Sequence, residues 1–152
     1  SVLFLLMSID LSFTLRRYRM IRNLIKSTLA VFFSWQIIDF IAHSQLMCGL
    51  YQATKDLWRP EAEMLWPLMM GVSLVVAFCF VAIYAFLIKP KSLQQGLRYG
   101  ILYGFAAALP MAFGTYSFSP IPLALAWGWF FTAMLEFVLA GLIVGALMKD
   151  EA

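Results

Sequence analysis

The chain alternates between long apolar runs and short clusters of charged residues. Four runs are long enough to cross the hydrocarbon core of a bilayer, about 30 Å thick, which takes about 20 residues in a helix. They predict transmembrane helices at residues 29–51, 64–88, 96–118 and 121–148. Pro60, Glu61 and Glu63 form a start signal ahead of the second helix. Two prolines between Ser117 and Pro122 predict a tight turn, so the last two helices form an antiparallel hairpin.

Composition places the predicted helices in lipid. Of the 152 residues, 63% are apolar and only 12% are charged, whereas about a quarter of the residues of a soluble domain are charged. The net charge of +3 comes from basic residues beside the apolar runs, which is typical of orientation signals and not of nucleic-acid binding. We therefore expect an all-α integral membrane protein with no nucleic-acid partner.

The distribution of lysine and arginine predicts how the helices are oriented. Nine basic residues flank the first helix, the loop between the second and third helices, and the end of the fourth, whereas Lys55 and Arg59 alone lie on the opposite side. Basic loops stay in the cytoplasm. The pattern predicts an up-down-up-down four-helix bundle with both termini cytoplasmic.

Residues 1–28 are predicted to form a short interfacial segment ahead of the transmembrane domain at residues 29–152. The first 13 residues are apolar but too short to span the membrane. The basic run that follows is expected to bind anionic lipid headgroups; it consists of Arg16, Arg17, Arg19, Arg22 and Lys26.

Small residues recur at intervals of four in both helices of the predicted hairpin. Such stripes let two helices approach closely in a membrane. One stripe contains Gly96, Gly100, Gly104 and Ala108; the last helix carries Gly128 and Thr132 on one stripe and Gly141 and Gly145 on the next. We expect these two helices to pack against each other, with a kink at Pro110.

Ionisable residues inside the apolar runs are the candidates for function. Asp39 lies thirteen residues after Lys26 and Glu136 thirteen residues before Lys149, so both are expected about 20 Å from the cytoplasmic boundary at the rise of a helix. Gln36 and His43 lie on the same helix face as Asp39. The spacing predicts a polar cluster of Gln36, Asp39, His43 and Glu136 that faces protein.

Two interpretations of this cluster remain open. A charge at mid-membrane costs at least about 2.5 kcal/mol, so these groups are expected to share a proton, hold a cation, or be hydrogen-bonded. The first interpretation is a proton or cation site. The second is a set of structural hydrogen bonds, with His43 bonded to Asp39 and Glu136 bonded to a tyrosine or a backbone carbonyl.

Metal and cofactor sites are weaker alternatives, and neither is predicted. His43, Met47 and Cys48, with methionines of the second helix, are possible copper(I) ligands, although methionine also fills apolar cores. His43 alone is a possible axial ligand of a haem or chlorin. Cys48 and Cys79 are expected too far apart for a disulfide.

Short motifs resemble those of small four-helix bacterial inner-membrane proteins classed as domains of unknown function. The motifs are Gly96-Leu97-Arg98-Tyr99-Gly100, Phe113-Gly114-Thr115-Tyr116, Ala126-Trp127-Gly128 and Ile38-Asp39-Phe40. The resemblance covers about two thirds of the chain. It implies a bacterial inner-membrane location and no established activity.

The leading functional hypothesis from the sequence is a non-enzymatic accessory subunit that contacts other membrane proteins, or its own copies, through small-residue helix faces. The alternative is an oligomeric proton- or cation-coupled transporter built around Asp39, His43 and Glu136. A third possibility is a haem-, chlorin- or copper-binding protein. With one histidine and no nucleophile cluster, we expect no enzyme.

Overall fold

The structure is a computed structural model that describes residues 2–149, with the side chains of residues 2–13 and of Arg16 left aside. Every regular element in this range is a helix. The α-helices are α1 (Val2–Ile41), α2 (Cys48–Ala53), α3 (Trp66–Leu87), α4 (Leu93–Leu109), α5 (Thr115–Phe118) and α6 (Leu123–Leu147). Two π-helical turns, η1 (Ala42–Leu46) and η4 (Pro110–Gly114), and two 3₁₀ turns, η2 (Lys55–Leu57) and η3 (Glu61–Glu63), complete the chain.

Four helical segments are long and apolar enough to cross a membrane, as predicted. They are Arg17–Leu46, Trp66–Leu87, Leu93–Phe118 and Leu123–Leu147. α1 runs unbroken through residue 29, where the first transmembrane helix was expected to begin, because residues 2–41 contain no glycine or proline that would interrupt it. The start signal predicted for the second helix was wrong. Glu61 and Glu63 form a 3₁₀ turn, and α3 begins at Trp66 with Pro67 in its first turn.

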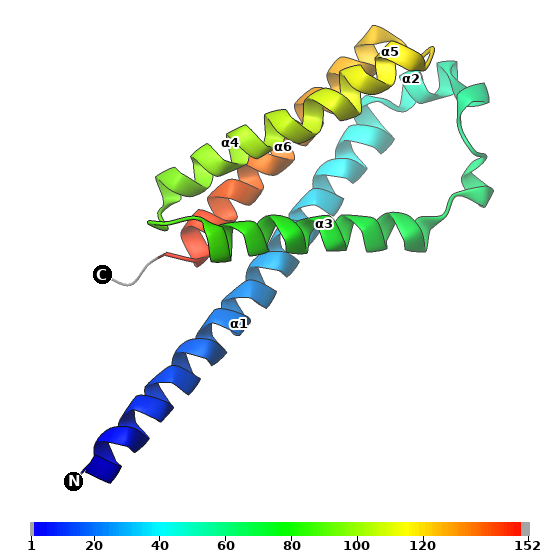
Figure 1. Cartoon of the computed structure of the whole chain (residues 1–152). Coiled ribbons are helices and arrows are strands. Elements are labelled where there is room, and N and C mark those ends of the chain that lie inside the picture. Colours follow the sequence, from blue (N-terminus) through cyan, green and yellow to red (C-terminus); the bar gives the residue numbers. More distant parts are fainter. Residues whose placement is uncertain (1, 150–152) are drawn as a thin grey trace.

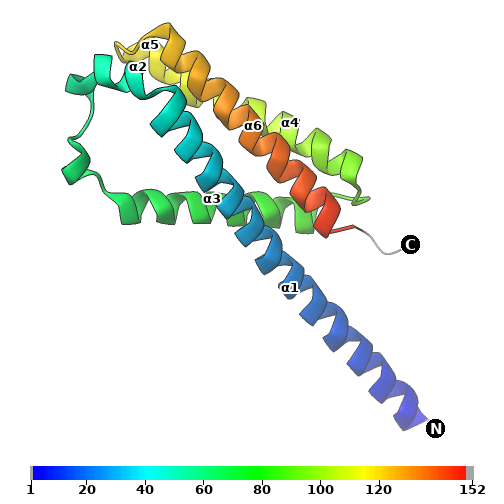
Figure 2. The same cartoon turned by 180° about the vertical axis from the view of Figure 1, so that it is seen from behind.

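α1 joins the N-terminal apolar segment, the basic run and the first span in one helix. Its N-terminal half extends well beyond the other helices (Figures 1 and 2). Arg17, Arg19, Arg22 and Lys26 are exposed on this helix, whereas the side chain of Arg16 lies outside the described residues. The position of residues 1–28 at the membrane interface stays a prediction.

α4 and α6 lie side by side and run in opposite directions, while α1 crosses α6 and α3 (Figures 1 and 2). The two helices of the hairpin meet at glycines. A Cβ added to Gly100 would lie 3.1 Å from the Cα of Gly141, and one added to Gly96 would lie 2.8 Å from the Cα of Gly145. Such spacing leaves no room for a side chain, so the backbones themselves are in contact.

The remaining members of the small-residue stripes have different neighbours. Gly104 faces Phe137, and Ala108 is fully buried. Gly128 packs against the thioether of Met47, beyond the end of η1, instead of against α4. Thr132 is half-buried on α6. Gly128 therefore belongs to the contact of α6 with the segment that follows the first span.

Pro110 ends α4 and begins the π-helical turn η4. Proline has no backbone N–H, so an α-helical hydrogen bond is missing at this position. The wider π-helical turn accommodates the interruption, and helical structure continues through α5 to Phe118.

Aromatic side chains from four helices form the centre of the molecule. Trp35 of α1, Phe80 of α3 and Phe137 of α6 are buried and in mutual contact, with ring centroids 5.1 to 6.3 Å apart. Tyr99 of α4 stacks on Phe80 and donates a hydrogen bond to its carbonyl oxygen, 2.9 Å away. The buried Tyr84 hydroxyl donates to the Ser92 carbonyl and accepts from the Ser92 amide, which fixes the α3–α4 loop.

The outer surface is apolar. Large side chains such as Ile37, Phe40 and Leu102 are exposed by 62%, 62% and 72%. Exposed apolar surface on this scale suits contact with lipid or with other membrane helices, and not with water.

Candidate functional site

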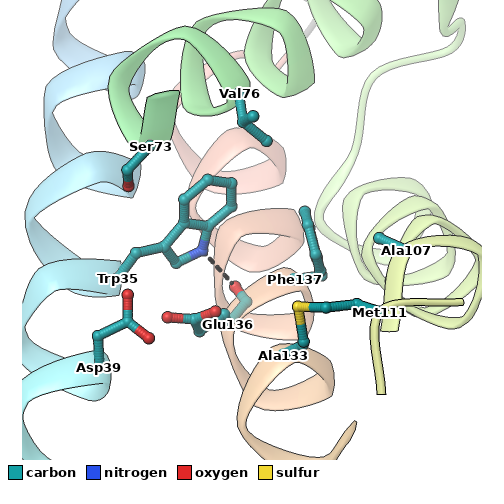
Figure 3. Close-up of a pocket in the computed structure, with 9 residues that line it drawn as sticks. All are labelled: Trp35, Asp39, Ser73, Val76, Ala107, Met111, Ala133, Glu136 and Phe137. Carbon is teal, nitrogen blue, oxygen red and sulfur yellow. Dashed lines mark hydrogen bonds between the residues drawn. The ribbon is translucent and has the colours of Figure 1, made fainter. Parts of the chain in front are cut away.

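A cavity of about 210 Å³ lies between α1, α3, α6 and the junction of α4 with η4. Each of the four candidate spans contributes to its lining (Figure 3). Its polar side chains are Asp39, Ser73 and Glu136. The cavity lies beside the aromatic centre, with Trp35 and Phe137 in its wall.

The cavity brings Asp39 and Glu136 together. Their carboxyl groups point toward one another from α1 and α6 (Figure 3), and they interact directly. The Glu136 Oε1 atom is shielded from the surface and has no hydrogen-bond partner among the described residues. Two acidic groups from different helices therefore face each other, with an unsatisfied oxygen atom between α1 and α6.

Trp35 fixes the geometry of this pair from α1. Its indole Nε1 donates a hydrogen bond of 3.0 Å to the backbone carbonyl of Glu136 (Figure 3). Only 5% of Trp35 is exposed, and its ring meets Phe137 edge to face at 5.1 Å. The contact locks α1 against α6 beside the two carboxyl groups.

His43 extends the polar cluster from Asp39 past the C-terminal end of α1. Its Nε2 atom lies 3.4 Å from Asp39 Oδ1, and its Nδ1 atom lies 2.5 Å from the Tyr51 hydroxyl. The indole Nε1 of Trp129 donates to the same hydroxyl over 2.6 Å. The π-helical turn η1 carries His43, and the short helix α2 carries Tyr51.

The donors and acceptors in this chain determine where the protons lie. An indole N–H can only donate, so the Tyr51 oxygen accepts from Trp129, and the Tyr51 proton is available for a hydrogen bond to His43 Nδ1. Neutral His43 then carries its proton on Nε2, facing Asp39. Burial, reinforced by the negative charge of Asp39, raises the pKa of Tyr51 against the smaller opposing effect of the Trp129 hydrogen bond, so the hydroxyl stays protonated.

Gln36 is the member of the predicted cluster that bonds a residue outside it. Its side chain donates to the Ser73 hydroxyl of α3 over 2.9 Å. The side chains of Asp39 and His43 remain 45% and 38% exposed, so they do not face protein alone. The predicted contact of His43 with Asp39 is long, at 3.4 Å, and Tyr51 bonds His43.

Sequence reasoning missed Trp35, Tyr51 and Trp129 as members of this site. Tyr51 follows His43 by eight residues, a helical spacing that puts both on one face and was an available signal. Trp129 comes from a helix 78 residues away in sequence. No local pattern predicts such a contact.

The candidate metal ligands do not converge. Met47 is buried against Gly128, and the Cys48 thiol accepts a hydrogen bond of 3.4 Å from Gln52. Both ring nitrogens of His43 are engaged, by Asp39 and by Tyr51. Among the described residues, no three histidine, cysteine, aspartate or glutamate side chains are grouped for a metal ion.

No protein-family model, curated protein or solved structure matches this chain. The resemblance to small bacterial inner-membrane proteins therefore stays a prediction. Function has to be argued from the cavity and its polar side chains.

Proposed function

We propose that this chain is a non-enzymatic membrane protein that moves protons or monovalent cations, with Asp39 and Glu136 as the binding groups. The observation that supports the proposal is the meeting of these two carboxyl groups in a cavity between the spans. His43 and Tyr51 connect that cavity to the end of the first span.

Two carboxyl groups inside a membrane are costly to ionise. An isolated carboxylate at the bilayer centre costs about 2.5 kcal/mol or more, and two adjacent carboxylates also repel each other. One proton or one monovalent cation between Asp39 and Glu136 relieves the repulsion and partners the unsatisfied Glu136 Oε1. A carboxyl pair that must be neutralised, and that a chain of hydrogen bonds can reach, is suited to bind and release a proton or a cation.

The route between the cavity and the membrane surface passes through His43. Imidazole accepts a proton on one nitrogen and releases it from the other, so it transfers protons between two neighbours. Here the neighbours are Asp39 at Nε2 and Tyr51 at Nδ1. Tyr51 lies beyond the first span, which ends at Leu46, and so connects the cluster to the interface.

The proposal includes an up-down-up-down bundle in a bacterial inner membrane with both termini cytoplasmic. The basic residues before α1, between α3 and α4, and after α6 support this orientation. Single cysteines at positions 59 and 89, in a chain without Cys48 and Cys79, test it with a membrane-impermeant thiol reagent added to intact cells. We expect labelling at position 59 alone; labelling at position 89 alone would reverse the orientation.

Proton flux in proteoliposomes tests the function. We expect Asp39→Asn and Glu136→Gln each to reduce flux at least about tenfold, because each removes a titrating group. Asp56→Asn, in the exposed loop between α2 and α3, is the matched control and should keep wild-type flux. Flux that persists in both cluster variants, at equal thermal stability, would exclude the proposed role.

An accessory subunit in a larger membrane assembly is the second candidate. It is favoured by the partial exposure of Asp39 and His43, 45% and 38%, because polar groups facing lipid favour a neighbouring helix or a second copy as cover. The glycines of α4 and α6, in contrast, already pack against each other. Recovery of a lone monomer after mild solubilisation would argue against this candidate; a larger complex with unaltered flux in the cluster variants would favour it over the transporter.

A further inference from the structure

The walls of the cavity contain more than the two carboxyl groups. Trp35 and Phe137 contribute aromatic rings, and Val76 and Met111 contribute apolar surface opposite Asp39 and Glu136 (Figure 3). A site for a bare metal cation needs six or more oxygen ligands for calcium, or octahedral oxygens and water for magnesium. This lining instead combines negative charge with aromatic and aliphatic surface.

Aromatic faces and carboxylates together favour one class of ligand, an organic cation. A cation within about 6 Å of a tryptophan ring is stabilised by about 0.5–2 kcal/mol, more when water is excluded. The Trp35 ring is held in place by its hydrogen bond to the Glu136 carbonyl and by its edge-to-face contact with Phe137. The aromatic wall is therefore already formed before a ligand enters.

The size of the cavity limits the ligand. Its volume of about 210 Å³ equals that of about seven water molecules at roughly 30 Å³ each. A ligand of similar size is a protonated primary amine with one ring, or a small tetraalkylammonium ion.

We propose that this cavity binds a small organic cation, with its charge on Asp39 and Glu136 and its apolar part against Trp35 and Phe137. The inference rests on the proposed function because it gives the same two carboxyl groups a substrate class. The cation and a proton then compete for the carboxyl pair. Such competition couples the movement of the organic cation to the movement of protons.

Binding to the full chain in lipid nanodiscs tests the inference directly. Benzylammonium and benzyl alcohol have the same size and differ mainly in charge, so we would titrate each by calorimetry at pH 7. We expect saturable binding of benzylammonium and only non-saturating partition of benzyl alcohol. Equal binding of the two, or no saturable binding of either benzylammonium or tetramethylammonium, would overturn the proposal.

Variants locate the bound cation. We expect Glu136→Gln to weaken benzylammonium binding at least about tenfold, because it removes one of the two carboxyl groups that can give up a proton to the bound cation's charge, and Trp35→Phe to weaken it about three- to tenfold through a poorer cation–π contact. Glu63→Gln, in the exposed η3 turn, keeps the wild-type affinity. Unchanged affinity in Glu136→Gln, with wild-type thermal stability, would place the cation elsewhere and overturn the proposal.

The outcome separates this inference from the proposed function. Proton flux that depends on Asp39 and Glu136 without amine binding would leave the proton function standing and remove the substrate class. Amine binding that depends on Glu136, without proton flux, would support the site and remove the proton function.

Discussion

Tyr51 determines which nitrogen of His43 carries the proton, because its own hydroxyl is already occupied by a donor. Trp129 donates to the Tyr51 oxygen, and the Tyr51 proton is available for His43 Nδ1. The remaining imidazole proton then faces Asp39 from Nε2. Two aromatic side chains thus orient the imidazole of His43.

Removal of the Tyr51 hydroxyl tests this arrangement. In the wild type we expect nitrogen NMR of His43 to show the neutral form protonated on Nε2, and in Tyr51→Phe we expect this preference to be lost. The variant should also lose about 1 kcal/mol of stability with its hydrogen bonds. Tyr116→Phe, on a tyrosine 42% exposed, is the control and should change neither property. A wild-type His43 protonated on Nδ1 alone would contradict the assignment.

Single residues were predictable from the sequence only in part. The depth of Asp39 and Glu136 follows from counting helical residues to the nearest lysine, and the structure brings the two together. The partner of Gln36 was not predictable, because Ser73 lies on another helix whose rotation the sequence does not specify. The contact of Trp129 with Tyr51 was not predictable for the same reason.

At the scale of helices, the contact of α4 with α6 depends on the absence of side chains. Gly96 and Gly100 lie against Gly141 and Gly145, with backbone atoms at van der Waals contact. Close approach of this kind replaces the hydrophobic driving force that is missing between helices in lipid. Gly71 on α3, by contrast, has no neighbour within 4 Å of an added Cβ.

An added methyl group is therefore expected to have opposite effects on stability at the packed glycines and at Gly71. We expect Gly100→Ala and Gly141→Ala each to destabilise the chain by about 1–3 kcal/mol, because the new Cβ meets backbone atoms. Gly71→Ala should be neutral or stabilise by up to about 1 kcal/mol, since alanine is the better helix former. Thermal unfolding in one detergent measures all three; equal stability of the three variants would refute the close contact.

The sequence pattern predicted which helices form and pair better than it predicted where each helix begins and ends. The glycine intervals and the proline-rich turn predicted the pairing of the last two helices, which the structure contains. The first helix was predicted to begin near residue 29, but α1 runs from Val2 because no residue before it breaks the helix. Charged residues mark a change of environment, and they do not by themselves end a helix.

The arrangement of the whole molecule could not be predicted from the sequence. α1 crosses both α3 and α6 (Figure 1), and this crossing forms the cavity from four helices far apart in the chain. Large apolar side chains lie on the exposed faces of the spans as well as in the core, so periodicity identifies no inward face. Only the polar residues and the glycine intervals indicated which faces meet.

The central claim is that Asp39 and Glu136 meet inside the membrane. Solid-state NMR of the full chain in lipid bilayers, with carbon-13 at the side-chain carboxyl groups, measures this contact, and Asp39→Asn assigns its signals. We expect a through-space correlation between the Asp39 and Glu136 carboxyl carbons, and we expect this correlation to shift in Asp39→Asn. A folded chain in bilayers without that correlation would contradict the account.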